Sequence, residues 1–485
     1  MFNDASVEEI HEVMEQSWNA FLIYRNSNLK QRATFMRAIA TEMEKLGDEL
    51  LHVAMEETAL PEARLRNERT RTIFQLNSYA DACEKGDWLE ARIDRAIPGR
   101  NPPKIDLRKM RMPLGPVVVF GAANFPFAYS TAGGDTASAF AAGCPVVVKA
   151  HPAHARTSEM VASAIMKAAA SQYLPQGIFA HIHGASFEVG KALVEHPHTR
   201  AVGFTGSQAG GRQLFDWGSR RPEPIPVFAE MSSINPVFLL PRKLESEPED
   251  IASLYASSIT LGVGQFCTNP GLIIAIDNDA LQIFIDRLGD LIVKTDPGTM
   301  LNAGIFKNFV ERRANALSQA GVETLAVAGA EALFNQGVPT LASVSAREFL
   351  SNPLLHQEVF GPYSLIVKCT DIHEMNEVAM HLEGQLTATL MATDEDLENS
   401  AELIANVREI CGRMVINGVP TGVEVTAAMH HGGPYPATTD SRFTSVGEDA
   451  IKRFSRPVVF QNWPEKFLPE ELRDENKLEI LRFER

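Results

Sequence analysis

One cysteine of the sequence lies in surroundings that suit covalent chemistry. Cys267 stands between a glycine-rich approach and a turn, in the run Gly262-Val263-Gly264-Gln265-Phe266-Cys267-Thr268-Asn269-Pro270-Gly271. Glycines and turn formers let the backbone approach a ligand, and a core cysteine does not need them. A helix is predicted over 251–261 and a buried strand over 272–276, so the thiol lies on a loop between two rigid elements. Cys267 is therefore a candidate nucleophile, and a small core residue is the alternative.

The remaining cysteines have no comparable surroundings. We assign them to the class of small core residues: Cys83, Cys144, Cys369 and Cys411. The total of five is odd, and the sequence contains no Cys-x-x-Cys pair. Such usage indicates reduced thiols, and we therefore expect a cytoplasmic protein.

Two polar residues follow apolar runs that are typical of strands. Asn124 comes shortly after Val117-Val118-Val119-Phe120, and Glu230 ends Val227-Phe228-Ala229-Glu230. A side-chain amide can donate a hydrogen bond to a developing oxyanion, and a partly desolvated carboxylate can act as a general base. The alternatives are an asparagine that shapes a turn before proline and an exposed acid at a strand end.

A second group of residues suits a nucleotide. Lys149 ends the strand 146–148, where a cation can reach ribose hydroxyls or a phosphate. Gly206 and Ser207 lie in Gly203-Phe204-Thr205-Gly206-Ser207, a strand, turn and helix start whose backbone N–H groups suit a pyrophosphate. A surface lysine and an ordinary turn are the alternatives.

The elements that must position these residues form an alternating series. Strands are predicted at 117–120, 146–148, 178–183, 201–204 and 226–230, with helices at 131–142, 158–170, 186–195 and 207–217. Strands separated by helices of this length indicate a parallel, doubly wound sheet that binds ligands at the carboxyl ends of its strands. After Cys267 a second set follows, with strands near 272–276, 364–367, 387–391 and 414–416 and helices near 280–293, 373–380 and 394–407.

The two alternating sets predict an α/β fold with two domains and an appendage. We expect a cofactor-binding domain formed by residues 1–92 and 114–231, with a helical first part, and a catalytic domain at 232–450. Residues 93–113 contain a helix-breaking Ile97-Pro98-Gly99 segment with strand-like flanks, and the tail 451–485 contains an apolar strand. We expect these two segments to form an arm, and a surface loop is the alternative for 93–113. A thiol from one domain and a nucleotide on the other would meet between them.

Composition excludes several classes of function. The chain has 485 residues, 45% of them hydrophobic and 22% charged, and a formal net charge of -16. This charge argues against a nucleic-acid or anionic membrane surface. No run approaches the ~18 apolar residues of a membrane span, and the first residues lack the pattern of a secretory signal. We expect neither nucleic acid nor a membrane as a partner.

Six motifs together resemble the aldehyde dehydrogenase superfamily. In chain order they contain Asn124, Lys149, Ser207, Glu230, Cys267 and Glu358. The matching stretches include Asn-Phe-Pro, Phe-Thr-Gly-Ser, Gly-Gln-Phe-Cys-Thr and Glu358-Val359-Phe360-Gly361-Pro362. The resemblance implies a Rossmann-type cofactor domain, an α/β catalytic domain and a small oligomerisation arm, in a homodimer or homotetramer. It also implies oxidation of an aldehyde to a carboxylate through a cysteine thiohemiacetal and thioester, with reduction of NAD(P).

The resemblance also implies roles for particular residues. Glu358 would hold the nicotinamide ribose and Phe360 would pack near the ring, while a strand-end Asn417 would support the site. Many members that prefer NAD carry a carboxylate three residues after the lysine, and this chain has Pro152 there, after His151. A carboxylate would repel a 2′-phosphate, so we expect NADP, with NAD possible. The chain departs from the family at Met231-Ser232-Ser233, where a Gly-Gly pair is usual.

The substrate is suggested by finer details. Lys149-Ala150-His151 and the segment 441–447 are most similar to the α-ketoglutaric semialdehyde (2,5-dioxovalerate) dehydrogenases. NADP-dependent dehydrogenases of fatty aldehydes are the alternative. An acylating enzyme, a cofactor-independent hydrolase and a non-catalytic paralogue fit the motifs less well. An anionic substrate would need a cation, for which Arg442 is a candidate, and a structural salt bridge is the equal alternative.

Two histidine pairs deserve separate treatment as metal ligands. These are His181/His183 and His430/His431, and neither has a further ligand at metal-binding spacing in the sequence. We therefore expect no metal site. The segment 430–436 is instead expected to shape a loop near the substrate tunnel.

Overall fold

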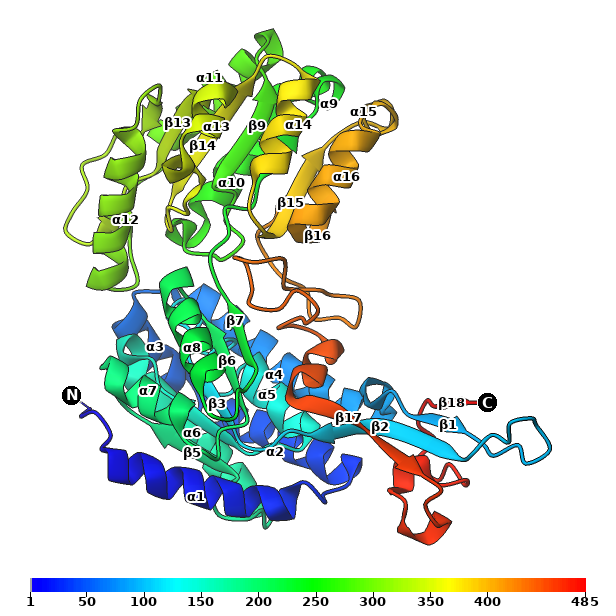
Figure 1. The fold of residues 1–485 in the computed structure, drawn as a ribbon. Coiled ribbons are helices and arrows are strands. Elements are labelled where there is room, and N and C mark those ends of the chain that lie inside the picture. Colours follow the sequence, from blue (N-terminus) through cyan, green and yellow to red (C-terminus); the bar gives the residue numbers. More distant parts are fainter. Residues whose placement is uncertain (1) are drawn as a thin grey trace.

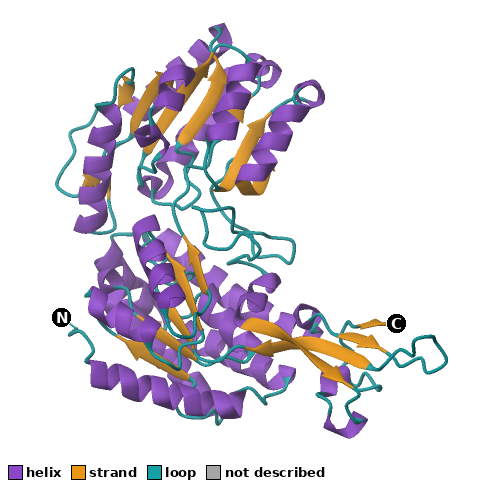
Figure 2. Ribbon diagram, viewed as in Figure 1, coloured by secondary structure: helices purple, strands orange, loops and turns teal. Residues whose placement is uncertain are grey.

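The computed structural model describes residues 2–485 and places two large sheets, one parallel and one mainly parallel, in separate lobes, one above the other in Figure 1. A third, smaller sheet extends sideways from the lower lobe (Figure 2). The first lobe contains the N-terminal helices and the first alternating series, and the second contains the alternating series that follows Glu230.

The first sheet has five parallel strands in the order β5-β4-β3-β6-β7. Their bounds are β3 (Val117–Phe120), β4 (Val146–Lys149), β5 (Phe179–Ile182), β6 (Ala201–Thr205) and β7 (Val227–Glu230). The chain adds β4 and β5 on one side of β3 and then β6 and β7 on the other. The order therefore reverses between β3 and β6, which is where doubly wound sheets bind their ligands.

Helices cover both faces of this sheet, and the valine-rich strands explain why. Val117 and Val119 enter one hydrophobic core while Val118 enters another, because successive side chains point to opposite faces. The covering helices are α1 (Val7–Tyr24), α2 (Leu29–Lys45), α3 (Gly47–Thr58), α4 (Glu62–Lys85), α5 (Gly134–Ala142), α6 (Ala155–Ser171), α7 (Phe187–Glu195) and α8 (Gln208–Arg220). The predicted capping box at Ser6 and Glu9 opens α1.

The second sheet has seven strands in the order β11-β13-β14-β9-β8-β15-β16. All neighbours are parallel except β11 and β13. The bounds are β8 (Val237–Leu239), β9 (Leu272–Ile276), β11 (Glu323–Val327), β13 (Thr340–Ser345), β14 (Tyr363–Cys369), β15 (Gln385–Met391) and β16 (Cys411–Ile416). The sequence predicted β9, β14, β15 and β16 but not the other three.

Eight helices named in the second lobe surround this sheet. They are α9 (Pro241–Ser246), α10 (Pro248–Thr260), α11 (Asp279–Val293), α12 (Ala303–Leu317), α13 (Ala346–Ser351), α14 (Ile372–His381), α15 (Asp394–Asn399) and α16 (Ala401–Ile410). A two-stranded ribbon of β10 (Gly298–Thr299) and β12 (Gln336–Gly337) lies beside them. Alternate residues of β8 and β9 again enter two cores, so this sheet is also buried on both faces.

The third sheet forms the sideways arm, in the order β17-β2-β1-β18 (Figure 1). Its strands are β1 (Arg92–Asp94), β2 (Leu107–Pro113), β17 (Ser455–Gln461) and β18 (Phe483–Glu484). The antiparallel pairing of β2 with β17 joins the two segments that the sequence predicted to be strand-like, although more than three hundred residues separate them. Within residues 2–485, the structure contains no helix that combines the length and the apolar character of a membrane span.

A buried ion pair fixes the base of the arm to the first lobe. Arg453, in the short helix η5 (Glu448–Phe454) before β17, lies 2.7 Å from Asp135 at the start of α5, and its side chain is 4% exposed. Removing one partner of a buried pair leaves an uncompensated charge, which destabilises a protein by about 3 kcal/mol or more.

We therefore expect Arg453→Met to lower the free energy of unfolding by about 3 kcal/mol because Asp135 is left without its counter-charge. Chemical denaturation measures this loss. Arg456→Met is the matched control, since Arg456 is exposed three residues further along the chain. Equal stability of the two variants would contradict this role of the ion pair.

Candidate functional site

The carboxyl ends of four neighbouring strands present the polar residues that the sequence singled out. Lys149 ends β4, Asn124 follows β3, Ser207 follows β6 and Glu230 ends β7. The register places Phe120 of β3 opposite both Lys149 and Phe204, so these ends lie at one edge of the sheet. The fold therefore gathers residues that are up to about a hundred positions apart in the chain.

The loop that carries Cys267 reaches this edge from the second lobe. After α10 the backbone passes through left-handed conformations at Gly262, Val263 and Gly264, with φ of 55°, 59° and 63°. A Cβ on Gly264 would lie 2.3 Å from the carbonyl carbon of Gly361, so only glycine fits this crossing. Strand β9 begins five residues after the thiol.

Asn235 fixes the backbone of the loop that carries Cys267. Its Nδ2 donates to the carbonyl oxygens of Cys267 and Asn269, both at 2.9 Å, and its Oδ1 accepts from Ser233 and Thr387, also at 2.9 Å. The side chain of Asn235 is fully buried. The two donors of Nδ2 thus fix the backbone of the loop, while the two hydroxyl groups that donate to Oδ1 fix the orientation of the amide.

The thiol of Cys267 lies in a buried polar cluster. Nε2 of His431 is 3.6 Å from Sγ of Cys267 and 2.9 Å from Oε1 of Glu230. The other carboxylate oxygen of Glu230 accepts a 2.6 Å hydrogen bond from Ser445. His431 is 1% exposed and Glu230 is 3% exposed. The structure therefore brings together Cys267 and Glu230, which the sequence predicted, and adds His431 and Ser445, which it did not.

Asn124 belongs to the first lobe, and its side chain contacts the loop that carries Cys267 in the second lobe. Its Nδ2 donates to the carbonyl oxygen of Gln265 at 3.2 Å, and Arg64 donates to the backbone carbonyl of Asn124 at 2.7 Å. Asn124 therefore sits against the backbone two residues before Cys267. A carboxylate, a thiol and an amide donor from different segments meet at one place.

Comparison with known proteins identifies the family of this chain. The sequence profile of the "Aldehyde dehydrogenase family" matches residues 1–456. The chain belongs to the aldehyde dehydrogenase family.

Among curated relatives, the chain is similar to "Alpha-ketoglutaric semialdehyde dehydrogenase 2" of Azospirillum brasilense, with 47% identity over 99% of this chain and 92% of that protein. It is also 45% identical to "Alpha-ketoglutaric semialdehyde dehydrogenase" of Acinetobacter baylyi, with the same shares covered. The fold resembles the crystal structure of methylmalonate-semialdehyde dehydrogenase from Oceanimonas doudoroffii, with TM-score 0.80, 18% identity and coverage of 95% and 92%. The family and the α/β fold predicted from the sequence are thus confirmed.

The electrostatics of this aldehyde dehydrogenase keep the thiol protonated at rest. Burial raises the pKa of Cys267 well above its ordinary value, and the neighbouring charge of Glu230 raises it further. Burial alone would also raise the pKa of Glu230, but the charge of His431 and the hydrogen bonds from His431, Ser445 and Cys267 outweigh it and lower that pKa. At neutral pH the cluster therefore contains a carboxylate and a thiol.

The family implies NAD(P) as cofactor, and the donor groups at the first lobe fit such a molecule. Ser207 caps the N-terminus of α8, and its Oγ accepts a hydrogen bond from the N–H of Gly210 at 3.2 Å. The N-terminus of this helix therefore faces the point where the strand order of the sheet reverses. A Cβ on Gly206 would lie 2.6 Å from the ring of Phe204, so the turn is confined to glycine. Lys149 is half-buried, and burial lowers the pKa of its ammonium group. An anionic group beside that ammonium would offset its desolvation.

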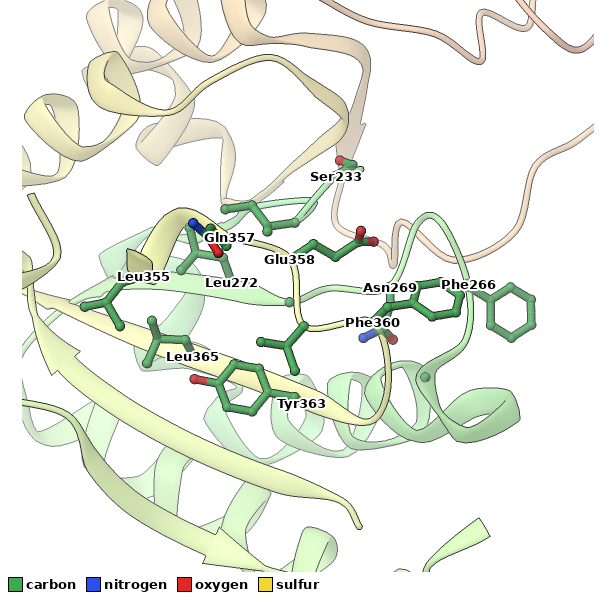
Figure 3. A pocket seen from close by; sticks show the side chains of 14 residues that line it. Ser233, Phe266, Asn269, Leu272, Leu355, Gln357, Glu358, Phe360, Tyr363 and Leu365 are labelled. Atoms are coloured by element: carbon green, nitrogen blue, oxygen red, sulfur yellow. The ribbon is translucent and has the colours of Figure 1, made fainter. Parts of the chain in front are cut away.

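Glu358 and Phe360 lie in the second lobe, before β14 (Figure 3). They help to line a pocket beside the loop that carries Phe266 and Asn269. Burial raises the pKa of Glu358 to about 7. Hydrogen bonds from the side chain of Ser232 and the backbone of Ser233 lower this pKa, but by less than burial raises it. These two serines occupy the place where the family usually has Gly-Gly, so the departure noted in the sequence contacts Glu358 directly.

His151 lies near Lys149 but carries no positive charge at neutral pH. Burial lowers the pKa of His151 to about 3, assisted by His154 and Lys149. Its Nδ1 accepts from the N–H of Ala153 at 3.1 Å. His151 can therefore offer a neutral N–H donor to a ligand, and the cation at this edge is Lys149.

The structure also shows the surroundings of Arg442 and of the two histidine pairs. The guanidinium of Arg442 binds Asp440 through Nε at 2.8 Å and Nη2 at 2.6 Å, and its side chain is 80% exposed, so Arg442 forms the structural salt bridge. Neither histidine pair has a further ligand at metal-binding spacing in the sequence, but the fold brings other ionisable groups close to them. Glu159 lies 3.2 Å from His181 and 2.8 Å from His183, and His431 lies beside Cys267 and Glu230. These partners are far away in sequence, which is why spacing did not find them.

The sequence did contain one signal for His431, because the segment 430–436 was placed near the substrate. The backbone N–H of His431 donates to Thr444 at 2.8 Å, and its carbonyl accepts from the N–H of Ser445 at 2.9 Å. These contacts join the segment to the stretch 441–447. Ser445 lies within the segment 441–447 that the sequence singled out, but nothing local indicated that this serine would contact Glu230.

We expect Asn235→Asp to reduce turnover about 10- to 100-fold, because a carboxylate would face two carbonyl oxygens and shift the thiol. Steady-state kinetics measures this reduction, and denaturation is expected to show a loss of about 3 kcal/mol. Asn399→Asp, the same change at an exposed helix residue whose Nδ2 also binds a carbonyl, is the control. Unchanged kinetics in Asn235→Asp would refute the positioning role.

The electrostatics of the cluster predict a pH effect. Because the charge of Glu230 raises the pKa of Cys267, Glu230→Gln should lower that pKa and increase the thiolate fraction. Alkylation by iodoacetamide, without cofactor, should therefore become faster at pH 8, and its pH profile should move to lower pH. Glu409→Gln, at a 79% exposed side chain, should leave the profile unchanged. Slower alkylation in Glu230→Gln would contradict this account.

Proposed function

We propose that this aldehyde dehydrogenase oxidises 2,5-dioxovalerate (α-ketoglutaric semialdehyde) to 2-oxoglutarate with NADP. The observation that carries the substrate is the 45–47% identity, over 99% of the chain, to two proteins named as α-ketoglutaric semialdehyde dehydrogenases. The chemistry is supported independently by the thiol, carboxylate and amide donor that converge between the lobes.

In the first step, we propose that Cys267 attacks the aldehyde carbon. The thiol is protonated at rest, so its proton must leave as the carbon–sulfur bond forms, and Glu230 is the acceptor. His431 positions the carboxylate, because its Nε2 lies within 3.6 Å of both partners. The oxyanion of the thiohemiacetal is held by Nδ2 of Asn124 and the backbone N–H of Cys267, in a site where desolvation strengthens each hydrogen bond.

In the second step, we propose that Glu230 first releases the thiol proton to solvent and then, as a carboxylate again, directs water to the thioester. It takes a proton from the water as the oxygen attacks, and Cys267 leaves as a thiolate that recovers this proton. Bound NAD(P) supplies the acceptor for the hydride that leaves the thiohemiacetal. Lys149, Gly206 and Ser207 would hold the nucleotide half of this cofactor, while Glu358 and Phe360 would hold the nicotinamide half.

Residues at the carboxyl end of β4 support our proposal that the enzyme prefers NADP to NAD. Lys149 supplies a cation there, and Pro152 stands where a carboxylate would repel a 2′-phosphate. His151 adds a neutral donor. We expect NAD to be used less efficiently, because its neutral 2′-hydroxyl attracts the ammonium group less strongly than a 2′-phosphate does.

Assembly and location are proposed on more general grounds. We propose that residues 1–92 and 114–231 bind the cofactor, that 232–450 form the catalytic domain, and that 93–113 with 451–485 join subunits into a homodimer or homotetramer. Large apolar side chains of the arm and tail, including Val459, Trp463 and Phe467, are 50–61% exposed, which supports a covered arm. The reduced cysteines support a cytoplasmic location.

The proposed function predicts NADPH formation, followed by absorbance, when 2,5-dioxovalerate and NADP are added. Cys267→Ala should lower kcat by at least about 10³-fold, because the covalent route is lost. Cys411→Ala, which changes a partly buried cysteine in β16, should keep full activity. Retained turnover in Cys267→Ala would refute the mechanism, and a strong preference for long-chain aldehydes would favour the fatty aldehyde alternative.

A further inference from the structure

Two arginines from different lobes converge on one loop near the thiol. Arg71 of α4 donates from Nη2 to the carbonyl of Val423 at 3.3 Å. Arg413 of β16 donates from Nη1 to Gly422 at 2.9 Å and from Nη2 to Pro420 at 2.5 Å. The loop 420–423 therefore lies between two cations, and neither belongs to the catalytic cluster described above.

Each of these arginines keeps a buried donor without an acceptor. Among residues 2–485, no atom accepts a hydrogen bond from Nη1 of Arg71 or from Nε of Arg413, although both nitrogens are screened from solvent. A buried guanidinium donor left unpaired is destabilising, and native proteins rarely retain one without a reason. A bound anion is the kind of partner that would satisfy such a donor.

Aromatic contacts connect these cations to the reacting sulfur. The guanidinium of Arg71 lies 5.4 Å from the ring centre of Tyr129, and that ring is 6.3 Å from the ring of His431. Nε2 of His431 is in turn 3.6 Å from Sγ of Cys267. The charge of Arg413 also lowers the pKa of Cys267, against the stronger effect of burial. Each of the two guanidinium groups also interacts electrostatically with Cys267, which acts to raise the pKa of that guanidinium, so both cations are neighbours of the thiol.

The chain's net charge makes such a local positive site necessary for an anionic substrate. With a formal charge of -16, the molecule as a whole repels a carboxylate. The buried acid beside Arg71, Glu68, accepts from the N–H groups of Phe127 and Ala128 at 2.8 and 3.0 Å. The guanidinium of Arg442 is already paired with the carboxylate of Asp440, so Arg442 does not provide this local positive site.

We propose that Arg71 and Arg413 form the subsite for the carboxylate of the substrate, with the aldehyde carbon at Cys267. The inference rests on the proposed function and adds the residues that select a semialdehyde acid over a neutral aldehyde. A carboxylate would replace the long hydrogen bond from Arg71 to Val423, because charge-assisted bonds to a guanidinium are stronger than bonds to a neutral carbonyl. The oxygen of the α-keto group next to the carboxylate adds a further hydrogen-bond acceptor for the same two guanidinium groups.

The test compares one anionic and one neutral aldehyde in the full-length enzyme with NADP. Arg71→Gln and Arg413→Gln should each lower kcat/KM for 2,5-dioxovalerate about 10- to 100-fold, while kcat/KM for butanal stays within about threefold. Arg71→Lys and Arg413→Lys, which keep the charge but lose the fork, should be intermediate. Arg442→Gln removes the same charge from the surface and should match the wild type with both substrates.

A binding measurement separates the subsite from catalysis. Calorimetry with 2-oxoglutarate should show binding to the wild type and to Arg442→Gln, and about 10-fold or more weaker binding to Arg71→Gln and Arg413→Gln. If kcat/KM of a variant fell equally for both aldehydes, the substitution would have disturbed the loop or the fold. That result would overturn a role confined to the carboxylate. Selective loss of 2,5-dioxovalerate in Arg442→Gln alone would also overturn it. If the wild type oxidised neither aldehyde, the proposed function itself would fail.

Discussion

The site depends on keeping a carboxylate, an imidazole and a thiol together where little water enters. Glu230 and His431 are almost fully buried, and the carboxylate stays ionised only because His431, Ser445 and Cys267 compensate its lost hydration. The same charge holds the thiol in its protonated form. A protein in this state avoids a permanently reactive thiolate, and under the mechanism that we propose the nucleophile would form when the substrate arrives and the proton moves.

The two lobes serve this cluster in different ways. The first lobe supplies Glu230 and Asn124 at the carboxyl edge of a parallel sheet, where helix starts and strand ends meet. The second lobe supplies Cys267 on a loop whose backbone is fixed by Asn235 and by the close crossing at Gly264. Each reacting group is thus fixed by hydrogen bonds or by its strand rather than by a long flexible side chain.

Local patterns predicted much of this architecture, while contacts made only by folding escaped them. Valine-rich runs and helical spacing indicated the first sheet, but β8 has three residues and β13 has the mixed composition Thr-Leu-Ala-Ser-Val-Ser, so neither gave a clear pattern. Cys267 and Glu230 could be predicted from a loop and a strand end. His431 lies 164 residues from Cys267, and only the tertiary fold unites them. Arg442 was chosen by charge, and the acid two residues away neutralises it.

The most direct test of the central claim is the intact mass of Glu230→Gln after mixing with NADP and 2,5-dioxovalerate. If Cys267 forms a thioester that Glu230 clears with water, the variant should accumulate one acyl group on Cys267, with one equivalent of NADPH and little further turnover. Its thiol can lose the proton to solvent, because removal of the Glu230 charge lowers the pKa of Cys267. Sustained turnover without an adduct, or an acyl group on another residue, would contradict the account.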